Sequence, residues 1–248
     1  MSISGQSGIG RIILFNDFCG PEIPVANLEA ATTPGHLSGP FKVTGDLVEA
    51  DTGIVSLSKS SGYVRISGND EDGKGVFVGT EVVFSPALNG TMVCECRLEL
   101  QALTARVVFV GFMGVNASDV AEPITSTATT CTRATNAVGF LLDSQITAGT
   151  KGHMPYMIST TASQTATAIA SSQVAVIAES DVLRVEVDNN GAARWFINGV
   201  LEKSIGAALA ATPATLMAAG VGCWGTTTTA ADADVDYLLV EANRDWTR

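Results

Sequence analysis

Short strand-like segments recur along this chain about every ten to fifteen residues, with no long amphipathic helix between them. They are rich in Val, Ile, Phe and Leu, and Gly, Pro, Asn, Asp and Ser mark the turns between them. The segments cover residues 10–18, 55–67, 79–103, 105–115, 137–144, 153–160, 181–204, 215–225 and 235–244. This spacing predicts an all-β antiparallel β-sandwich rather than alternating strands and helices.

In two of these segments the order of apolar and polar residues predicts which faces of the strand are buried. In residues 91–100 Met92, Cys94, Cys96, Leu98 and Leu100 alternate with more polar residues, as in a strand with one buried face. Residues 105–115 (ARVVFVGFMGV) are almost entirely apolar, which predicts a central strand buried on both faces. Residues 137–144 and 153–160 are expected to pair with each other.

Helix signals are short. The best candidates are residues 24–30 (PVANLEA) and 206–211 (GAALAA), and neither extends over several turns. Residues 1–9 are expected to form a flexible N-terminal arm, and residues 10–248 a single sandwich domain. At 248 residues the chain is a normal length for one such domain.

Composition excludes several functions. The net charge of −11 argues against nucleic-acid binding, because phosphate contacts need clustered Lys and Arg. No apolar run is long enough to span a bilayer, so we expect no membrane partner. The start of the sequence, MSISGQSGIGR, lacks the pattern of a signal peptide, so we expect a cytosolic product that leaves, if at all, by lysis or assembly. The five cysteines are therefore expected to be reduced: Cys19, Cys94, Cys96, Cys131 and Cys223.

Catalytic and metal motifs are weak. Only two histidines occur, His36 and His153, and there is no nucleophile elbow, so a hydrolytic triad is not expected. Glycine-rich stretches lead into strands rather than helices, so no nucleotide cofactor is expected. Two acidic runs leave calcium open as an alternative to solvated acidic surfaces: Asn69, Asp70, Glu71 and Asp72 in one, and Asp232, Asp234 and Asp236 in the other.

Glycoside hydrolysis needs two carboxylates facing a groove. Glu95 and Glu99 share a face of one predicted strand, but Arg97 stands between them where a third acid would be needed. We therefore expect no enzyme, no catalytic residues, no cofactor and no metal. A sugar site would instead need exposed aromatic side chains, and the candidates are Trp195, Trp224, Trp246, Tyr63, Tyr156 and Tyr237.

Three segments are rich in Thr, Ser and Ala: residues 125–135, 159–173 and 225–236. Small hydroxyl residues form exposed loops, or flat polar strands that pair with another chain. Both interpretations remain open, and the second predicts contact with another protein.

The order of strands resembles the concanavalin A-like (laminin-G-like) jelly roll over residues 10–245. The stretch most similar to that group is LRVEVDNNGAARWFINGVL, residues 183–201: a strand, an Asn-rich turn with Gly, an aromatic strand and an Asn-Gly turn. The group includes lectins, glucanases and non-catalytic adhesion modules, so the resemblance implies a fold more than a function.

Two functions are compatible with these features. The chain resembles structural proteins of tailed-bacteriophage virions in three ways. It has Thr/Ser/Ala-rich segments, it lacks an export signal, and it lacks catalytic motifs. This resemblance implies a capsid decoration protein, assembled in the host cytoplasm, that binds the major capsid protein or other virion proteins and forms a homo-oligomer. The alternative is a carbohydrate-binding, lectin-like adhesion module that recognises a host glycan, either free or on a virion.

Residues 187–201 (VDNNGAARWFINGVL) predict a hairpin with two turns, at Asn189-Asn190-Gly191 and at Asn198-Gly199. Between the turns Trp195 and Ile197 share one face, and Arg194 and Phe196 share the other. One of the two adjacent aromatic residues must therefore point into the core. Alternation alone leaves open which one it is.

Overall fold

The computed structural model describes residues 10–20, 26–27, 36–46, 52–68, 70–116, 120–133, 136–147, 154–158, 163–165, 170–207, 210–226 and 230–245. The predicted N-terminal arm, residues 1–9, lies outside the described residues, as do His153 and Trp246. In the described part no helix is long and apolar enough to cross a membrane.

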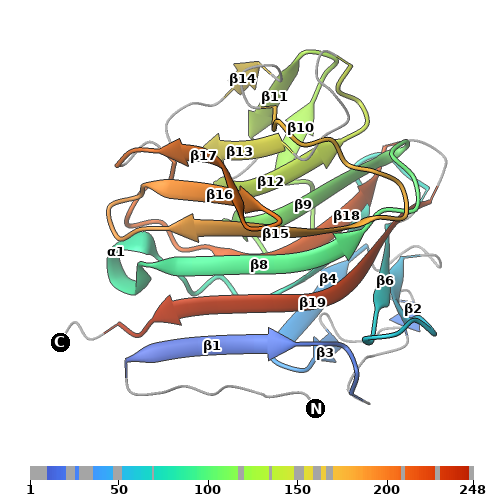
Figure 1. Cartoon of the computed structure of the whole chain (residues 1–248), viewed down its shortest axis with the longest axis horizontal. Helices are drawn as coiled ribbons and strands as arrows, with labels where there is room; N and C mark the ends of the chain where they lie inside the picture. Colours follow the sequence, from blue (N-terminus) through green and yellow to red (C-terminus); the bar gives the residue numbers. More distant parts are fainter. Residues whose placement is uncertain are drawn as a thin grey trace.

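Strands are the main regular structure of the described chain, as predicted (Figure 1). The one short helix among the described residues is α1 (Pro86–Asn89). The strands are β1 (Arg11–Asn16), β2 (Ala26–Asn27), β3 (His36–Ser38), β4 (Phe41–Gly45), β5 (Gly53–Ser56), β6 (Val64–Gly68), β7 (Gly75–Gly79), β8 (Met92–Glu99), β9 (Arg106–Met113), β10 (Ile124–Ser126), β11 (Thr130–Arg133), β12 (Ala137–Asp143), β13 (Met154–Ile158), β14 (Ser163–Thr165), β15 (Ser180–Val187), β16 (Ala193–Ile197), β17 (Val200–Ile205), β18 (Ala218–Gly225) and β19 (Ala231–Asn243).

These strands form two large antiparallel sheets and one small one. The nine-stranded sheet has the order β17-β16-β15-β8-β19-β6-β5-β2, and β1 also pairs with β19. The seven-stranded sheet has the order β13-β12-β9-β18-β7-β4-β3, and it includes the predicted pair of residues 137–144 and 153–160. The antiparallel sandwich predicted from the spacing of the strands is therefore confirmed.

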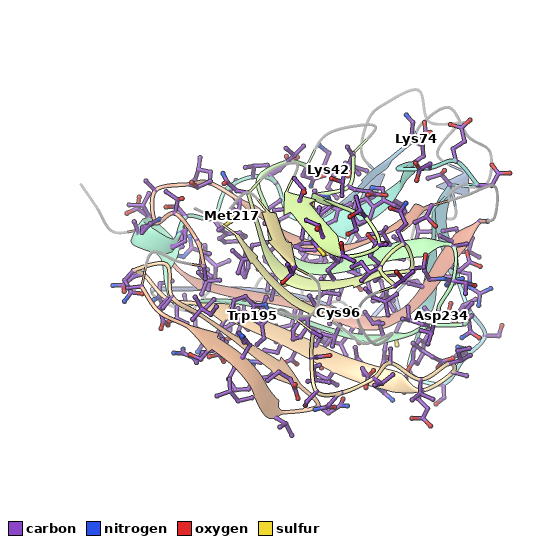
Figure 2. All side chains as sticks on the ribbon, turned by 90° about the horizontal axis from the view of Figure 1, so that it is seen from above. Lys42, Lys74, Cys96, Trp195, Met217 and Asp234 are labelled. Carbon is purple, nitrogen blue, oxygen red and sulfur yellow. The ribbon has the colours of Figure 1, made fainter. Side chains whose placement is uncertain are left out.

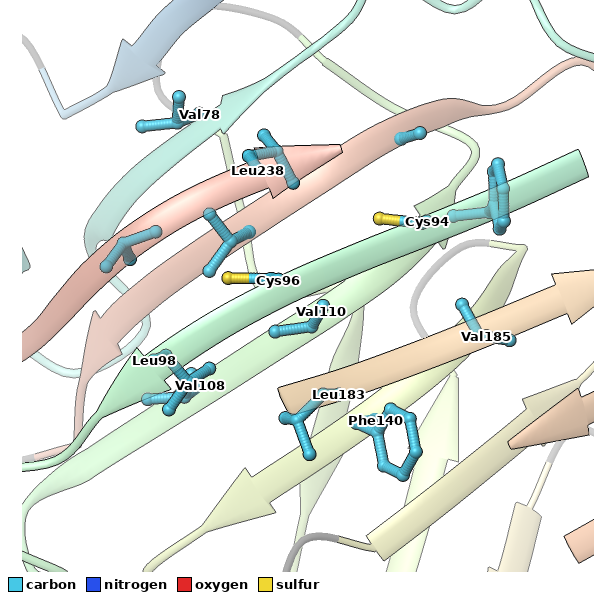
Figure 3. Close-up of a cluster of buried hydrophobic side chains, with 14 of the residues drawn as sticks. Val78, Cys94, Cys96, Leu98, Val108, Val110, Phe140, Leu183, Val185 and Leu238 are labelled. Carbon is cyan, nitrogen blue, oxygen red and sulfur yellow. The ribbon is translucent and has the colours of Figure 1, made fainter. Parts of the chain in front are cut away.

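The main core lies between the two large sheets. Met92, Cys94, Cys96 and Leu98 of β8 are almost fully buried there, which confirms the predicted alternation. The inner sides of the neighbouring strands supply the facing side chains, among them Leu183, Val185 and Leu238 from the same sheet and Val78, Val108, Val110 and Phe140 from the other (Figure 3). A strand with one apolar face folds this way because burial removes that face from water.

The seven-stranded sheet is apolar on both faces. Every residue of β9, β12 and β18 is buried, as predicted for residues 105–115. The outward-pointing Phe77, Phe109 and Trp224 pack with Val120, Ile124 and Cys131 into a second apolar cluster. Val120, Ile124 and Cys131 thus cover these rings on the outer face of the sheet.

A row of glycines runs across the seven-stranded sheet. Gly139 lies opposite Gly111, Gly111 opposite Gly220, and Gly220 opposite Gly79 on four adjacent strands. A Cβ at Gly139 would meet the Phe109 ring, and one at Gly79 or Gly220 would meet the Phe77 ring. The missing side chains therefore let these two rings of the second cluster lie close against the backbone.

Two local predictions were wrong. Residues 24–30 include the strand β2, and the described residues of 206–211 form no helix. The observed helix, α1, begins at Pro86 within residues 79–103, which were predicted to be strand-like, because a proline fits the first turn of a helix.

The Thr/Ser/Ala-rich segments pair mainly with one another. Parts of residues 125–135 and 159–173 form the three-stranded sheet β10-β11-β14. The third segment contributes the start of β19. Within the described residues these strands pair inside this chain, and contact of the segments with another protein stays a prediction.

Candidate functional site

Neither tryptophan in the described residues is available to a ligand. Trp195 is fully buried and points from β16 into the main core (Figure 2), and its indole N–H donates to the Gly139 carbonyl oxygen at 3.0 Å. Trp224 is fully buried in the second cluster, and its indole N–H donates to Val120 O at 2.9 Å. Phe196, next to Trp195, lies partly buried on the outer face. The hairpin of residues 187–201 is therefore architecture rather than an aromatic binding platform.

Tyr63 is also structural. It is 6% exposed, and its hydroxyl shares a hydrogen bond with Ser180 Oγ at 2.9 Å. The Lys59 ammonium lies 5.1 Å from its ring centre and the Arg97 guanidinium 5.9 Å from it, a cation–π arrangement. The side chain of Tyr156 lies outside the described residues.

Tyr237 is the described aromatic candidate that keeps a ligand-accessible position. It lies partly buried on the outer face of β19, where the Phe15 ring of β1 stands 6.0 Å away with a tilt of 38°. Its hydroxyl donates to Glu95 Oε1 at 2.7 Å. Burial, followed by this hydrogen bond to a carboxylate, raises the pKa of Tyr237, so the hydroxyl stays protonated.

Charged side chains surround Tyr237 on the same outer face. Glu95 of β8 also accepts from Arg184 Nη1 of β15 at 3.1 Å. Arg184 and Arg194 both contact Glu186, and Arg194 continues the row to Asp188. On the other side of Glu95, Arg97 pairs with Asp236 at 2.5 Å. Opposite charges thus alternate across neighbouring strands, which fixes the side chains and holds hydrogen-bonding groups at the surface.

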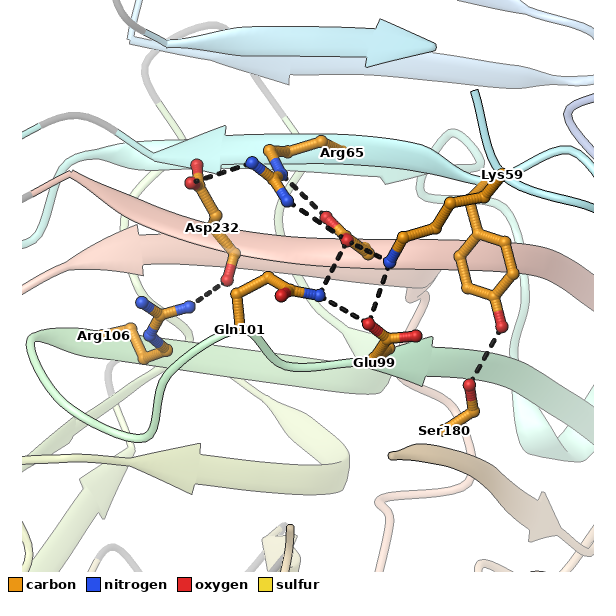
Figure 4. A network of polar contacts seen from close by, with 9 residues as sticks. Lys59, Arg65, Glu99, Gln101, Arg106, Ser180 and Asp232 are labelled. Atoms are coloured by element: carbon orange, nitrogen blue, oxygen red, sulfur yellow. Dashed lines mark hydrogen bonds and ion pairs between the residues drawn. The ribbon is translucent and has the colours of Figure 1, made fainter. Parts of the chain in front are cut away.

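A second polar network lies at the far end of β8 (Figure 4). The fully buried carboxylate of Asp234 accepts from Lys59 Nζ and Arg65 Nε, each at 2.7 Å, and from Gln101 Nε2 at 3.0 Å. Glu99 accepts from the same Lys59 at 2.8 Å. Burial alone would raise the pKa of Asp234, but the hydrogen bonds from Arg65 and Lys59 outweigh it and lower that pKa.

These contacts bear on the calcium alternative for residues 232–236, because they place the carboxylates in ion pairs. Asp232 and Asp234 do share the outer face of a strand, but Arg65 and Lys59 neutralise Asp234. A register shift between Val235 and Tyr237 interrupts the alternation before Asp236, which pairs with Arg97. Among the described residues no three Asp, Glu, His or Cys side chains form a group that could hold a metal.

A buried acidic pair lies away from this face. Glu122 and Asp143 are 7% and 5% exposed, and Glu122 Oε1 and Asp143 Oδ2 have no hydrogen-bond partner in the described part of the chain. Burial, and then the nearby charges of Asp143 and Asp72, raise the pKa of Glu122 to about 8. Asp72 belongs to the acidic run of residues 69–72, for which calcium was left open as an alternative, and Asn69 lies outside the described residues. Sequence analysis missed Glu122, because no spacing pattern marks it.

All five cysteines are free thiols, as expected for reduced cysteines. Cys94, Cys96, Cys131 and Cys223 are buried free thiols, and Cys19 is an exposed free thiol. Burial raises the pKa of Cys94 and of Cys223 to about 12, so these thiols are unreactive. The side chain of His36 lies outside the described residues, although its backbone forms part of β3.

No protein-family profile matches this chain, and no curated protein matches it in sequence. Solved structures do match it. Protein SO2946 of unknown function from Shewanella oneidensis MR-1 matches with a TM-score of 0.60 and 11% identity, over 100% of this chain and 92% of that one. The carbohydrate recognition domain of Emp46p matches with a TM-score of 0.53 and 10% identity, over 87% and 94%.

A third match is Rv0315 of Mycobacterium tuberculosis, described as a pseudo β-1,3-glucanase. Its TM-score is 0.50 at 10% identity, over 92% of this chain and 97% of that one. The fold is the concanavalin A-like sandwich. The resemblance seen in residues 183–201 is thereby confirmed at the level of fold. Identities this low carry the fold alone, so the function must be argued from the chain's own residues.

Proposed function

We propose that this chain is a non-catalytic carbohydrate-binding module, and that it binds sugar on the outer face of the nine-stranded sheet around Tyr237 and Phe15. The observation that carries the proposal is this pair of partly buried rings with Glu95 and Arg184 beside it. Aromatic rings pack against the apolar faces of sugar rings, and planar polar groups nearby bind the hydroxyls.

The architecture supports this face over the other. Val120, Ile124 and Cys131 cover the rings on the outer face of the seven-stranded sheet, whereas the outer face of the nine-stranded sheet carries polar side chains from β8, β15, β16 and β19. The ion pairs hold those side chains in place before a ligand arrives, which lowers the entropy lost on binding. With a net charge of −11, the chain suits neutral glycans better than sulfated or uronic ones.

Three features support a non-catalytic site. Glu95 and Glu99 of β8 share the outer face, but Arg184 binds the first and Lys59 the second. Arg97 lies between them and pairs with Asp236. A glycosidase needs a carboxyl that reaches the leaving oxygen, whereas Asp234 on this face is fully buried and bound by Arg65 and Lys59.

A glycan array followed by calorimetric titration of each hit tests the proposal. Tyr237→Ala and Phe15→Ala should each weaken binding at least tenfold while the thermal transition stays cooperative. Phe196→Ala, on the same face but on β16, is the matched control and should bind normally. An array without hits would refute the sugar site. Polysaccharide hydrolysis that disappears in Glu95→Gln would refute the non-catalytic assignment.

The decoration protein of a tailed-bacteriophage virion is the second candidate, and its location on a virion stays a prediction. The small sheet β10-β11-β14 favours it, because Thr125 and Thr132 present neutral hydroxyl surface suited to a flat protein lattice. Co-sedimentation with capsids and electron microscopy of particles would test it. A protein found solely as a free monomer in infected cytosol would exclude it. The two functions are compatible if the virion binds host glycans.

A further inference from the structure

Most of the unpartnered buried oxygens in the described part of the chain belong to one region of the fold. Glu122 Oε1, Ser126 Oγ and Asp143 Oδ2 have no hydrogen-bond partner there, and Thr52 Oγ1 is the other such atom. Folded chains leave few buried polar atoms without a partner, and a bound water or ion explains many of the exceptions. Three such oxygens in one region therefore point to a ligand that binds oxygen.

Two packed layers bring these oxygens together. Ile124 of β10 is fully buried in the second apolar cluster, so Ser126, two residues further along the same strand, points to the same side. Leu141 of β12 belongs to the same cluster, so Asp143 also faces the layer between β10 and the seven-stranded sheet. The Ser126 hydroxyl and the Asp143 carboxyl thus approach this layer from opposite sides.

Contacts between the two segments bring the groups close to each other. Thr147 N donates to Ala128 O at 2.9 Å, which holds the chain after β12 against the chain after β10. Burial raises the pKa of Asp143, and the Ser126 hydroxyl beside it opposes the rise. After burial, the charge of Asp143 is the main cause of the raised pKa of Glu122. The two carboxyls and the hydroxyl are therefore neighbours.

No described cation balances the two carboxyls. Neither Glu122 nor Asp143 forms an ion pair with a described Lys or Arg, and Asp72 adds a third negative charge nearby. Asp72 is exposed and accepts from Gln145 Nε2 at 3.2 Å, and Gln145 N donates to Asp143 Oδ1 at 2.8 Å. These contacts connect the buried acidic pair with the surface by a negatively charged route, which attracts a cation.

We propose that this region is a calcium site, in which the carboxylates of Glu122 and Asp143 and the hydroxyl of Ser126 bind one ion between β10 and the seven-stranded sheet. Ca²⁺ takes about six to eight oxygen ligands, so backbone carbonyls and waters complete the set. Because no third Asp, Glu, His or Cys of the described residues joins the group, we expect a dissociation constant on the order of 10⁻⁴ to 10⁻³ M.

The ion has a structural role in this position. It links residues 122–126 to the end of β12, and so it stabilises the packing of Ile124 over the outer face of the seven-stranded sheet. The sugar site around Tyr237 lies on the outer face of the other large sheet. Each proposal is therefore tested independently of the other.

Thermal unfolding of the full chain in EDTA and in about 10 mM calcium chloride tests the inference, because a ligand that binds the folded chain alone raises its stability. Calcium should raise the Tm of the wild type by about 4 °C. Magnesium chloride at the same concentration should raise it less than half as much, because Mg²⁺ needs a stricter geometry and gives up its waters reluctantly. Calorimetric titration of the EDTA-treated and dialysed protein measures the calcium affinity.

Three variants locate the ion. Glu122→Gln and Asp143→Asn each remove a carboxylate and keep the shape of the side chain, so calcium should raise their Tm by less than about 1 °C. Both should still unfold cooperatively in EDTA, which separates loss of binding from loss of folding. Ser126→Ala removes a hydroxyl alone and should weaken calcium binding about threefold or more.

Asp70→Asn is the matched control, because Asp70 is an exposed acid in the run of residues 69–72. This variant should keep the full calcium response, and its loss there would show that calcium binds the exposed run instead. The inference would also be overturned by a wild type with the same Tm in EDTA and in calcium, by equal responses to calcium and magnesium, or by a calcium response that Glu122→Gln and Asp143→Asn both retain.

Discussion

Trp195 and Phe196 are neighbours in β16 and point to opposite faces of the nine-stranded sheet. Trp195 is fully buried between the two sheets, with its indole N–H bound to the Gly139 carbonyl oxygen of the other sheet. Phe196 lies partly buried on the outer face, beside Arg184 in the β15–β16 pairing. The hydrogen bond from Trp195 thus links the two sheets, whereas the side chain of Phe196 remains partly exposed on the outer face.

Trp195→Ala should lower the free energy of unfolding by about 3 to 5 kcal/mol, because a large buried ring is replaced by a cavity and the Gly139 carbonyl loses its donor. Urea unfolding followed by circular dichroism measures the change. Phe196→Ala should cost less than half as much. Equal losses in the two variants would contradict the assignment of Trp195 to the core.

Gly111→Ala should destabilise the chain by about 1 to 3 kcal/mol through overpacking. The φ angle of Gly111 is +149°, and an added Cβ would meet Val138 O and the Cα of Gly139, 2.5 Å away, on the neighbouring strand. Gly206→Ala is the control, because no heavy atom lies within 4 Å of the Cβ that it adds. The stability of this variant should equal that of the wild type. Thermal unfolding of both variants measures the difference. If Gly111→Ala is as stable as the wild type, the glycine row is not required for stability.

Glu122 should make the fold less stable as the pH rises. Its pKa is about 8 in the folded chain and near 4.5 in the unfolded one, so the folded state holds the proton more tightly. From this group, stability is highest below pH 4.5 and falls by at most about 1.4 kcal/mol per pH unit up to pH 8. Denaturant unfolding across this range measures the fall.

Glu122→Gln mimics the protonated carboxyl and should flatten that pH dependence. Glu179→Gln replaces an exposed carboxyl and should leave the wild-type dependence in place. If the wild type shows a flat profile between pH 5 and pH 8, Glu122 is not held protonated in the fold.

Asp234→Asn should destabilise the fold by about 2 to 3 kcal/mol, because Lys59 and Arg65 then lose their shared charged acceptor. The lowered pKa of Asp234 means that its contribution is present above the unfolded value, near 3.8, and is lost as the pH falls through the folded one. The difference between wild type and Asp234→Asn should therefore shrink in acid. Asp232→Asn, whose side chain is 30% exposed and lies 3.8 Å from Arg65, should have a smaller effect.

The sequence indicated the single residues of the candidate site but not which of them lie together. Tyr237, Glu95 and Arg97 each belonged to a recognisable pattern, yet Phe15 joins them through pairing of β1 with β19, across more than two hundred residues. Local patterns carry no information on which distant strands pair, so such clusters appear only once the sheets are assembled.

The sequence by itself determined the fold class, the buried alternation of β8, the double burial of β9 and the hairpin turns of residues 187–201. These features follow from side-chain periodicity and turn chemistry, which are local properties of the chain. The tertiary structure decided that Trp195 rather than Phe196 is buried, and that strands from residues 125–135 and 159–173 pair with each other. Alternation fixes two opposite faces, but only packing against a second sheet decides which face leaves water.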